Sequence, residues 1–552
     1  MAILRKNSKR LEGLEVSSPD LLRAAPARLL LRSLGSIFST SEGRAATFEL
    51  SRPVEVIDEF LSHSWLTKGW LKTVALMYRV NLWRALAASL ATHVLVHALD
   101  HAGLAFPIPP VAQGFMFNRD RCFRMRWQLH YVPACIVFLA LLVFGQELPF
   151  SPQRTCFLDK CCIHQTDEAK KMAGIRQLGG FLHRSKKMVT LWQPEYFTRL
   201  WCVYEVAAFH FLNPEEHGSL DIVPLKLPLF TVTIFLFHTC ASISLTVLSP
   251  LLLFSEWHSS WVAENIPGWL QYVYLVAAMA VIMFFGLYLI PSYFFWKFCK
   301  WHMEDRRKLL LQLRNFRMDQ AECFMDSDRE LVVGKIRRWF GSIDEFERYV
   351  REDLYNLMRM KLEKHGPMRY RMSVVGALPH VFIASSLGVH AVEDGELGLA
   401  WRLFIVLLLI VFCTDAIALN LSLRLADTSF GDGVGLHKLR GPATMALCFA
   451  IVNATCVSVL TPAAHIVLTV TLALMFAIVT FLLYGGITRT KEIDERLCDR
   501  RRRGRQGSGG HLQRKQGSEV AADADASCEK TGAASTGDRD EVDSDGETIH
   551  SV

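Results

Sequence analysis

Long apolar runs alternate with charged blocks along this chain of 552 residues. A run of about 20 mostly apolar residues can cross a bilayer as a helix, because a helix satisfies its own backbone hydrogen bonds. The pattern predicts a multi-pass α-helical membrane protein with about eight spans. The stronger runs are 129–144, 227–254, 269–295, 403–421, 443–460 and 466–486, and the weaker runs, which contain histidines, are 85–99 and 373–392.

The charges between these runs predict which side of the membrane each block occupies. The polar blocks are rich in Lys and Arg, whereas the loops 255–268 and 391–399 contain neither. Because basic residues gather on the cytoplasmic side, the polar blocks are expected in the cytosol: 1–80, 149–226, 297–371 and 487–552. The loop before residue 129 disagrees with this assignment through four arginines: Arg119, Arg121, Arg124 and Arg126.

The composition agrees with a membrane protein, and it does not favour a secreted disulfide-bonded protein or a nucleic-acid-binding protein. Hydrophobic residues make up 51% of the chain. The 14 cysteines are scattered rather than regularly spaced, which does not indicate a secreted disulfide framework. The net charge of +7 is modest, and no nucleic-acid partner is expected.

The two ends of the chain differ from the rest. Residues 1–55 form a basic segment, in which 21–38 are amphipathic and fit either an organelle-targeting helix or an interfacial or linker helix. No cleavable signal peptide is predicted. Residues 487–552 have too few apolar side chains to fold alone, so this tail is expected to be disordered. Its polybasic start, 500–503, fits either lipid headgroup binding or a topology signal.

Short buried strands alternate with helices in two cytosolic pieces, 56–80 and 149–226. Strands are predicted at 56–65, 155–159, 187–192 and 221–225, with helices between the last three. This alternation predicts an α/β fold with a parallel sheet, whose ligand groups lie at the carboxyl ends of the strands. A predicted membrane hairpin, 81–148, separates the two pieces.

Four motifs in these pieces resemble a known family. FLSHSW at 60–65, FLDK at 157–160, the following loop, and above all YFTRLWCVYEVAAF at 196–209 resemble a Toll/interleukin-1 receptor (TIR) domain, most closely the membrane-embedded TIR-like proteins of algae and protists. The resemblance implies a flavodoxin-like fold, here split by the hairpin and without a fifth strand and last helix. It also implies self-association through this domain.

The resemblance assigns chemistry to individual residues. In catalytic TIR domains a glutamate of the third helix serves NAD cleavage, and Glu205 matches it; a carboxylate there can stabilise an oxocarbenium-like state. Phe60 and Ser62 match the nucleotide-holding strand end. Three further candidate contacts follow from position alone. Asp159 can cap or position the loop after its strand, and Lys160 can attract a phosphate or face solvent. Trp201 lies four residues before Glu205 on the same helix face and fits either a nucleotide contact or a core anchor. A scaffold-only domain, in which Glu205 has a structural role, remains an alternative.

Other polar residues favour no further chemistry. Cys156, Cys161, Cys162 and His164 lack the two-plus-two spacing of zinc ligands, so no metal site is predicted. His63 and His164 fit acid–base roles or ordinary surface positions. No glycine-rich phosphate loop points to a kinase or dehydrogenase.

The C-terminal half is predicted to contain helices only. Residues 297–371 form cytosolic helices, with a capping box at 342–345 and a buried face made of Phe346, Val350, Leu354 and Leu357. They are expected either to dock on the α/β core or membrane, or to bind a separate partner. Residues 372–486 are predicted to hold four spans. Within them Asp415, with His380 and His465 as candidate partners, fits an ion path or a structural hydrogen bond between helices.

Three functions fit these observations. The first is a membrane signalling protein whose cytosolic TIR-like domain self-associates and hydrolyses NAD, its substrate. The second is a transporter or channel regulated by a non-catalytic TIR-like scaffold, and the third is a pure scaffold. In each of them the lipid bilayer is a partner.

Overall fold

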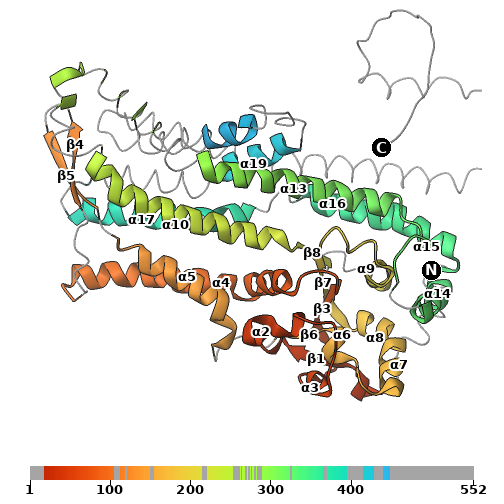
Figure 1. The fold of residues 1–552 in the computed structure, drawn as a ribbon. Coiled ribbons are helices and arrows are strands. Elements are labelled where there is room, and N and C mark those ends of the chain that lie inside the picture. Colours follow the sequence, from red (N-terminus) through yellow and green to blue (C-terminus); the bar gives the residue numbers. More distant parts are fainter. Residues whose placement is uncertain are drawn as a thin grey trace, which may run out of the picture. The chain divides into compact units, whose positions relative to one another are not determined.

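The computed structural model describes most of the chain up to residue 447 (Figure 1). The described residues are 18–104, 112–118, 121–127, 129–148, 154–213, 220–252, 289–323, 326–364, 370–393, 415–427 and 439–447, with isolated positions between 261 and 281 and at 397. The tail 487–552, the predicted span 466–486, and most of the spans 269–295, 403–421 and 443–460 lie outside them.

A mixed six-stranded sheet forms the centre of the α/β part. Its order is β2 (Arg52–Pro53), β1 (Arg23–Pro26), β6 (Thr155–Phe157), β3 (Ile57–His63), β7 (Ser185–Trp192) and β8 (Leu220–Pro224). The last four strands are parallel and lie at the positions that the sequence predicts. In chain order they run second, first, third, fourth, which is the order of flavodoxin-like sheets.

The prediction of a wholly parallel sheet is wrong at one edge. There β1 pairs antiparallel with both β6 and β2. The strand β6 has only three residues, and β1 covers backbone groups that would otherwise form an open edge. The contact is close because Ala24 and Ala25 are small and fully buried.

The amphipathic segment 21–38 is part of this α/β core. It forms β1, α2 (Ala27–Gly35) and the short helix η2 (Ser36–Phe38). Leu30, Leu31 and Phe38 are buried in the same apolar cluster as the strands. The apolar face that suggests a targeting or interfacial helix therefore packs against the sheet.

The helix after β3 continues far beyond the sheet. This helix, α4 (Gly69–His101), packs its first turns into the α/β core through Leu71, Ala75 and Leu76. Its next turns enter a second apolar cluster, which also contains residues of α5 (Val132–Phe144) and of α10 (Lys226–Leu252), α13 (Leu289–Arg314), α17 (Tyr370–Glu393) and α19 (Asp415–Ala426). The hairpin of β4 (Ala112–Asn118) and β5 (Arg121–Trp127) lies between α4 and α5.

The predicted fold class, a multi-pass membrane protein with about eight spans, is wrong for the described residues. Among them, two helices are long and apolar enough to cross a membrane: α4 and residues Lys226–Ser244 of α10 (Lys226–Leu252). The run at 129–144 forms a helix of 13 residues whose Ala134 and Phe138 are fully buried against neighbours. Apolar runs therefore also arise here from helix-to-helix packing, which hydropathy alone does not distinguish from contact with lipid.

Several further helices lie in the C-terminal half, in addition to a short one at 440–447. They are α13 (Leu289–Arg314), α14 (Asp326–Phe340), α15 (Ile343–Tyr349), the π-helix η5 (Val350–Leu354), α16 (Tyr355–Lys364), α17 (Tyr370–Glu393) and α19 (Asp415–Ala426). The side chain of Asp415 and the whole of His465 lie outside the described residues, and the ring of His380 lies 4.3 Å from that of His238 in α10.

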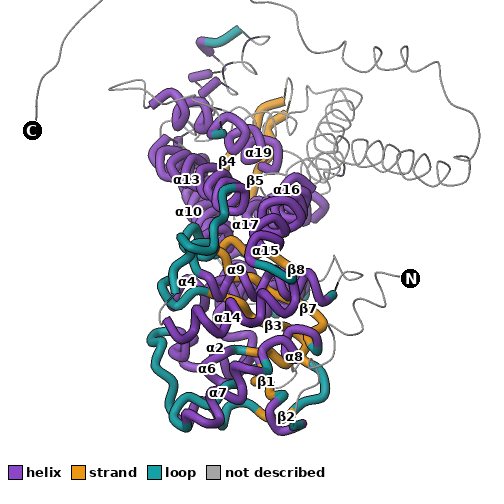
Figure 2. The backbone as a smooth tube through the Cα atoms, turned by 90° about the vertical axis from the view of Figure 1, so that its right-hand side faces the viewer, coloured by secondary structure: helices purple, strands orange, loops and turns teal. Residues whose placement is uncertain are grey.

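The predicted helical region 297–371 docks on the α/β core. The Ser342 hydroxyl accepts a hydrogen bond from the Glu345 backbone N–H (3.1 Å), which caps α15 as expected. Phe346, Val350 and Leu354 are fully buried, and Trp339 stacks on Tyr204 of α9 (Leu200–Leu212) at 5.7 Å. Figure 2 shows α14 and α15 beside α9 and the strands. Of the two alternatives, docking on the core is the one observed.

Candidate functional site

The carboxyl end of β3 is the point where ligands bind in sheets of this order. Ser62 pairs with Thr190 and His63 with Leu191 of β7, while β6 borders β3 on its other side. In sheets of this order the chain connections generally leave this position toward opposite faces, which opens a crevice at the carboxyl edge of the first and third strands. Side chains at the ends of β3, β6 and β7 are therefore the candidates for binding a ligand.

Glu205 reaches this edge from α9. The Ser62 hydroxyl donates a hydrogen bond to Glu205 Oε2 (2.5 Å), and Ser62 is also hydrogen-bonded to the hydroxyl of Tyr196. With Ser62 donating to the carboxyl, Tyr196 donates to Ser62. Ser62 and Tyr196 are fully buried, whereas Glu205 is only partly buried. A strand, a loop and a helix thus hold the carboxyl group of this partly buried residue in a fixed place.

Trp201 shares the accessible face of α9 with Glu205. Along the first two turns of the helix, from Leu200 to Ala207, these two side chains are partly exposed and the others are buried. Residues four apart lie on the same face of a helix, so the indole and the carboxyl are neighbours. This pair places an aromatic side chain beside an ionisable group, and the role of Trp201 as a nucleotide contact stays a prediction.

Burial raises the pKa of Glu205 to about 8, and the nearby Asp159 carboxylate adds to the rise, while the hydrogen bond from Ser62 opposes it. The carboxyl group is therefore largely protonated at pH 7. A positive charge bound beside it would favour the ionised form, because an opposite charge at short range lowers the pKa of a carboxyl group. The site is electrostatically suited to a cationic ligand group.

Asp159 and Lys160 follow β6 but have different roles. Asp159 accepts hydrogen bonds from the Trp65 indole N–H (2.8 Å) and from the backbone N–H of Lys160 (2.7 Å), and its side chain is partly exposed at the site. The buried Lys160 amine instead donates to the carbonyl oxygens of Ile37 (3.0 Å) and Thr40 (2.8 Å). Lys160 therefore binds the N-terminal segment to the core rather than facing a nucleotide.

Phe60 does not line the site. Its ring is fully buried and stacks on Phe157 with centroids 4.5 Å apart, in the middle of the sheet. Phe60 lies three residues before the end of β3, which at about 3.3 Å per residue places it about 10 Å from the ligand edge. The assignment of Phe60 as a ligand contact is corrected to a core position.

Two buried bases lie next to the predicted residues. Burial lowers the pKa of His63 to about 4, with the Lys72 cation adding to the decrease and Asp159 opposing it, so the imidazole is neutral at pH 7. The Lys72 amine lies 4.7 Å from the Trp65 ring centroid, and among the described residues it has no hydrogen-bond partner. The sequence analysis did not identify Lys72. Its spacing of three and four residues from the apolar Ala75 and Leu76, both buried, places it on the same buried helix face and could have indicated it.

The cysteine group near β6 is packed in the core. Cys156, Cys161 and Cys162 are buried, and burial raises the pKa of Cys161 to about 12. His164 lies apart from them, its Nδ1 accepting a hydrogen bond from the Asp167 N–H (3.0 Å). Within the part of the chain that is described, no three His, Cys, Asp or Glu side chains are arranged to hold a metal ion.

Comparison with protein families, with curated proteins and with solved structures gives no match for this chain. The chemistry of the site is therefore the basis for inferring its function. It combines a partly accessible carboxyl group of raised pKa, a neighbouring indole, and the switch-point edge of the sheet.

Proposed function

We propose that this chain is a membrane-associated signalling protein whose α/β domain self-associates and hydrolyses NAD at Glu205. The observation that carries the proposal is the Glu205 carboxyl group, held by Ser62 and Tyr196 at the end of β3. The resemblance of residues 196–209 to the catalytic helix of TIR domains supports the same assignment.

The chemistry follows from the charge of the substrate. Nicotinamide in NAD is a cationic pyridinium, and its arrival beside Glu205 favours the carboxylate form. When the bond between ribose and nicotinamide breaks, its electron pair stays on the nicotinamide nitrogen, and positive charge moves to the ribose. The carboxylate stabilises this oxocarbenium-like state. Water then bonds to the ribose carbon and loses a proton, which yields ADP-ribose and neutral nicotinamide.

The neighbouring residues position the two partners. Ser62 and Tyr196 fix the carboxyl group by hydrogen bonds, which reduces the reorganisation needed during bond breaking. The Trp201 indole offers a face on which the nicotinamide or adenine ring can stack. Asp159, held by the Trp65 indole, adds negative charge on the same edge.

The long helices and exposed apolar side chains support the remaining parts of the proposal. The far half of α4 exposes Val94 (67%) and Leu95 (57%), as expected for a helix that contacts lipid. Near the site, Leu66 and Trp70 are 61% and 52% exposed and offer an apolar contact for a second copy of the chain.

Release of nicotinamide from NAD by the purified full-length protein in detergent tests this function. The wild type should release nicotinamide, and Glu205→Gln should lose at least about a hundredfold in rate. The matched control is Glu195→Gln, an exposed glutamate in the loop before α9, which should keep the wild-type rate. Equal release by the wild type and Glu205→Gln, or none by the wild type, would exclude hydrolysis at Glu205.

A further inference from the structure

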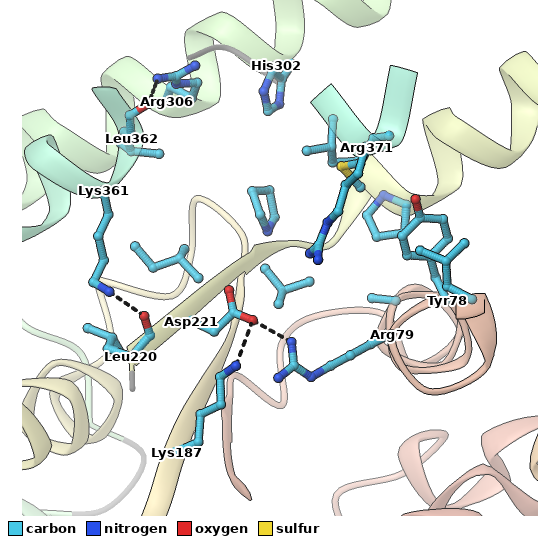
Figure 3. A pocket seen from close by; sticks show the side chains of 18 of the residues that line it. Tyr78, Arg79, Lys187, Leu220, Asp221, His302, Arg306, Lys361, Leu362 and Arg371 are labelled. Carbon is cyan, nitrogen blue, oxygen red and sulfur yellow. Dashed lines mark hydrogen bonds and ion pairs between the residues drawn. The ribbon is translucent and has the colours of Figure 1, made fainter. Parts of the chain in front are cut away.

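A second candidate site lies beside β8 and α4, away from the residues that hold Glu205. It is a cavity of about 440 Å³, bounded by β8, the early turns of α4 and α10, and residues of α13, α16 and α17. Figure 3 shows side chains from these elements converging on it. Neither Glu205 nor any residue hydrogen-bonded to it lines this cavity.

The cavity wall is strongly basic. Among the described residues that line it, six are Arg or Lys and one is a carboxylate, Asp221. The six are Arg79, Arg154, Lys187, Arg306, Lys361 and Arg371. Figure 3 shows Arg371 extending into the cavity from above, toward Asp221. A concave wall of one charge sign concentrates ions of the opposite sign.

Two carboxylates partly neutralise one side of this wall. Arg79 forms ion pairs with Asp221 (2.5 Å) and with Glu59 (3.0 Å). Lys187 lies 3.7 Å from Asp221, and Arg154 lies 3.4 Å from Glu59. Three cations thus share two carboxylates, and this side of the cavity retains positive charge.

The other side of the cavity adds three more cations. Arg306 donates to the carbonyl oxygen of Leu362 (2.9 Å), and Lys361 donates to that of Leu220 (2.7 Å). Carbonyl oxygens carry no net charge, so these bonds orient both side chains without removing their charge. Together with the exposed Arg371, they give a ligand donors from several directions.

The cavity also lies next to the later turns of α4, which expose several apolar side chains. Trp83, in its wall, is 68% exposed, and Leu90, Val94 and Leu95 expose apolar surface further along the helix. At about 1.5 Å per residue, Leu90 lies about 10 Å beyond Trp83. Tryptophan and basic side chains next to an apolar surface are typical of the headgroup level of a membrane.

We propose that this cavity binds a multiply charged phosphate group, either in the headgroup of an anionic phospholipid or in a soluble polyphosphate. Arginine and lysine around a concave site bind phosphate oxygens by charge-assisted hydrogen bonds, and arginine can do so through two parallel N–H groups. This binding does not depend on NAD hydrolysis, since the two sites share no residue.

Binding to the full-length protein tests this proposal with two probes. One probe is inorganic pyrophosphate added to protein in detergent. The other is a phosphatidylcholine vesicle that contains phosphatidylinositol bisphosphate, compared with a vesicle of phosphatidylcholine and phosphatidylserine of equal total charge. Arg371→Gln should weaken binding by about tenfold or more. Arg337→Gln, an exposed arginine of α14 outside the cavity, is the control for loss of one positive charge and should bind like the wild type.

Asp221→Asn is expected to act in the opposite direction. It removes the carboxylate from the cavity while Arg79 keeps its pair with Glu59, so anions should bind more tightly than in the wild type. A gain of affinity separates the proposal from general misfolding. Selective binding to the bisphosphate vesicle would identify a lipid source, and binding of pyrophosphate with no vesicle preference a soluble one.

The proposal is overturned if neither probe binds saturably, or if Arg371→Gln and Arg337→Gln bind equally well. Nicotinamide release by the Arg371→Gln variant should equal that of the wild type. An inactive wild type that still binds anions would therefore refute the proposed hydrolysis alone.

Discussion

Replacing Glu205 by Gln should change how the stability of the protein depends on pH. Gln keeps the shape and the acceptor oxygen that Ser62 bonds, but it cannot ionise. In the wild type, burial raises the pKa of Glu205 from 4.5 to about 8. Below pH 4.5 the glutamate is neutral in both the folded and the unfolded chain, so pH has no effect through this group.

Between pH 4.5 and 8 the unfolded wild type ionises Glu205 while the folded protein keeps it protonated. The stability that the neutral glutamate contributes is thus lost as pH rises through this range, and the loss is complete above the folded pKa. The full rise in pKa corresponds to about 5 kcal/mol of unfolding free energy, and partial exposure of the side chain reduces this to about 2–4 kcal/mol.

Thermal unfolding of both proteins in detergent from pH 4 to 9 measures this difference. The Tm of Glu205→Gln minus the Tm of the wild type should increase by about 5–15 °C from pH 4 to pH 9. This range applies to a domain that unfolds as a unit of about 150–250 residues. Glu195→Gln should show no such trend. A constant Tm difference between wild type and Glu205→Gln across this range would refute the raised pKa and the electrostatic account of the site.

Four further predictions follow from the same contacts. If the carboxylate is the active form, kcat/KM for NAD should rise with pH and level off above about 8, which initial-rate measurements of nicotinamide release will show. Ser62→Ala removes a hydrogen bond that lowers the Glu205 pKa, so it should move this profile to higher pH; an unchanged profile would contradict the contact. Arg79→Met leaves Glu59 and Asp221 as buried charges without Arg79 and should lower stability by about 2–4 kcal/mol, seen as a lower Tm at pH 7; an unchanged Tm would mean that the pairs contribute little. Trp70→Ala should reduce self-association in analytical ultracentrifugation without changing Tm, and an unchanged oligomer would place the contact elsewhere.

The two proposed sites lie at different places on the α/β domain. Glu205 and its hydrogen-bonded neighbours lie at the carboxyl edge of β3, and the basic cavity lies beside β8 and the first turns of α4 and α10. Both long apolar helices begin at the domain, so a ligand at the basic cavity would contact the point where the helices leave the sheet. The proposed anion site therefore lies next to the two helices that are proposed to contact the membrane.

Most local elements of the α/β domain could be predicted from the amino-acid sequence. Short apolar runs bounded by polar residues located β3, β6, β7 and β8, because a buried strand needs apolar residues on both faces. The capping pattern at 342–345 located the start of α15, because the side-chain cap depends on residues three apart. Helix spacing also placed Trp201 and Glu205 on one face. These features depend on residues that are close together in the chain, so they can be predicted from the sequence.

Long-range packing determines which apolar segments contact other helices and which surfaces remain exposed, and the sequence did not predict it. Hydropathy is the same for a residue packed against protein and one facing lipid, so the predicted number of spans was too large for the described residues. Tertiary packing also buries Phe60 and Lys160 in the core and brings residues 21–38 onto the sheet. It places Lys72 beside the Trp65 ring, next to the site. These outcomes depend on contacts between residues far apart in the chain. Such contacts bury Glu205, which raises its pKa, and they bring the basic side chains together around the cavity beside β8.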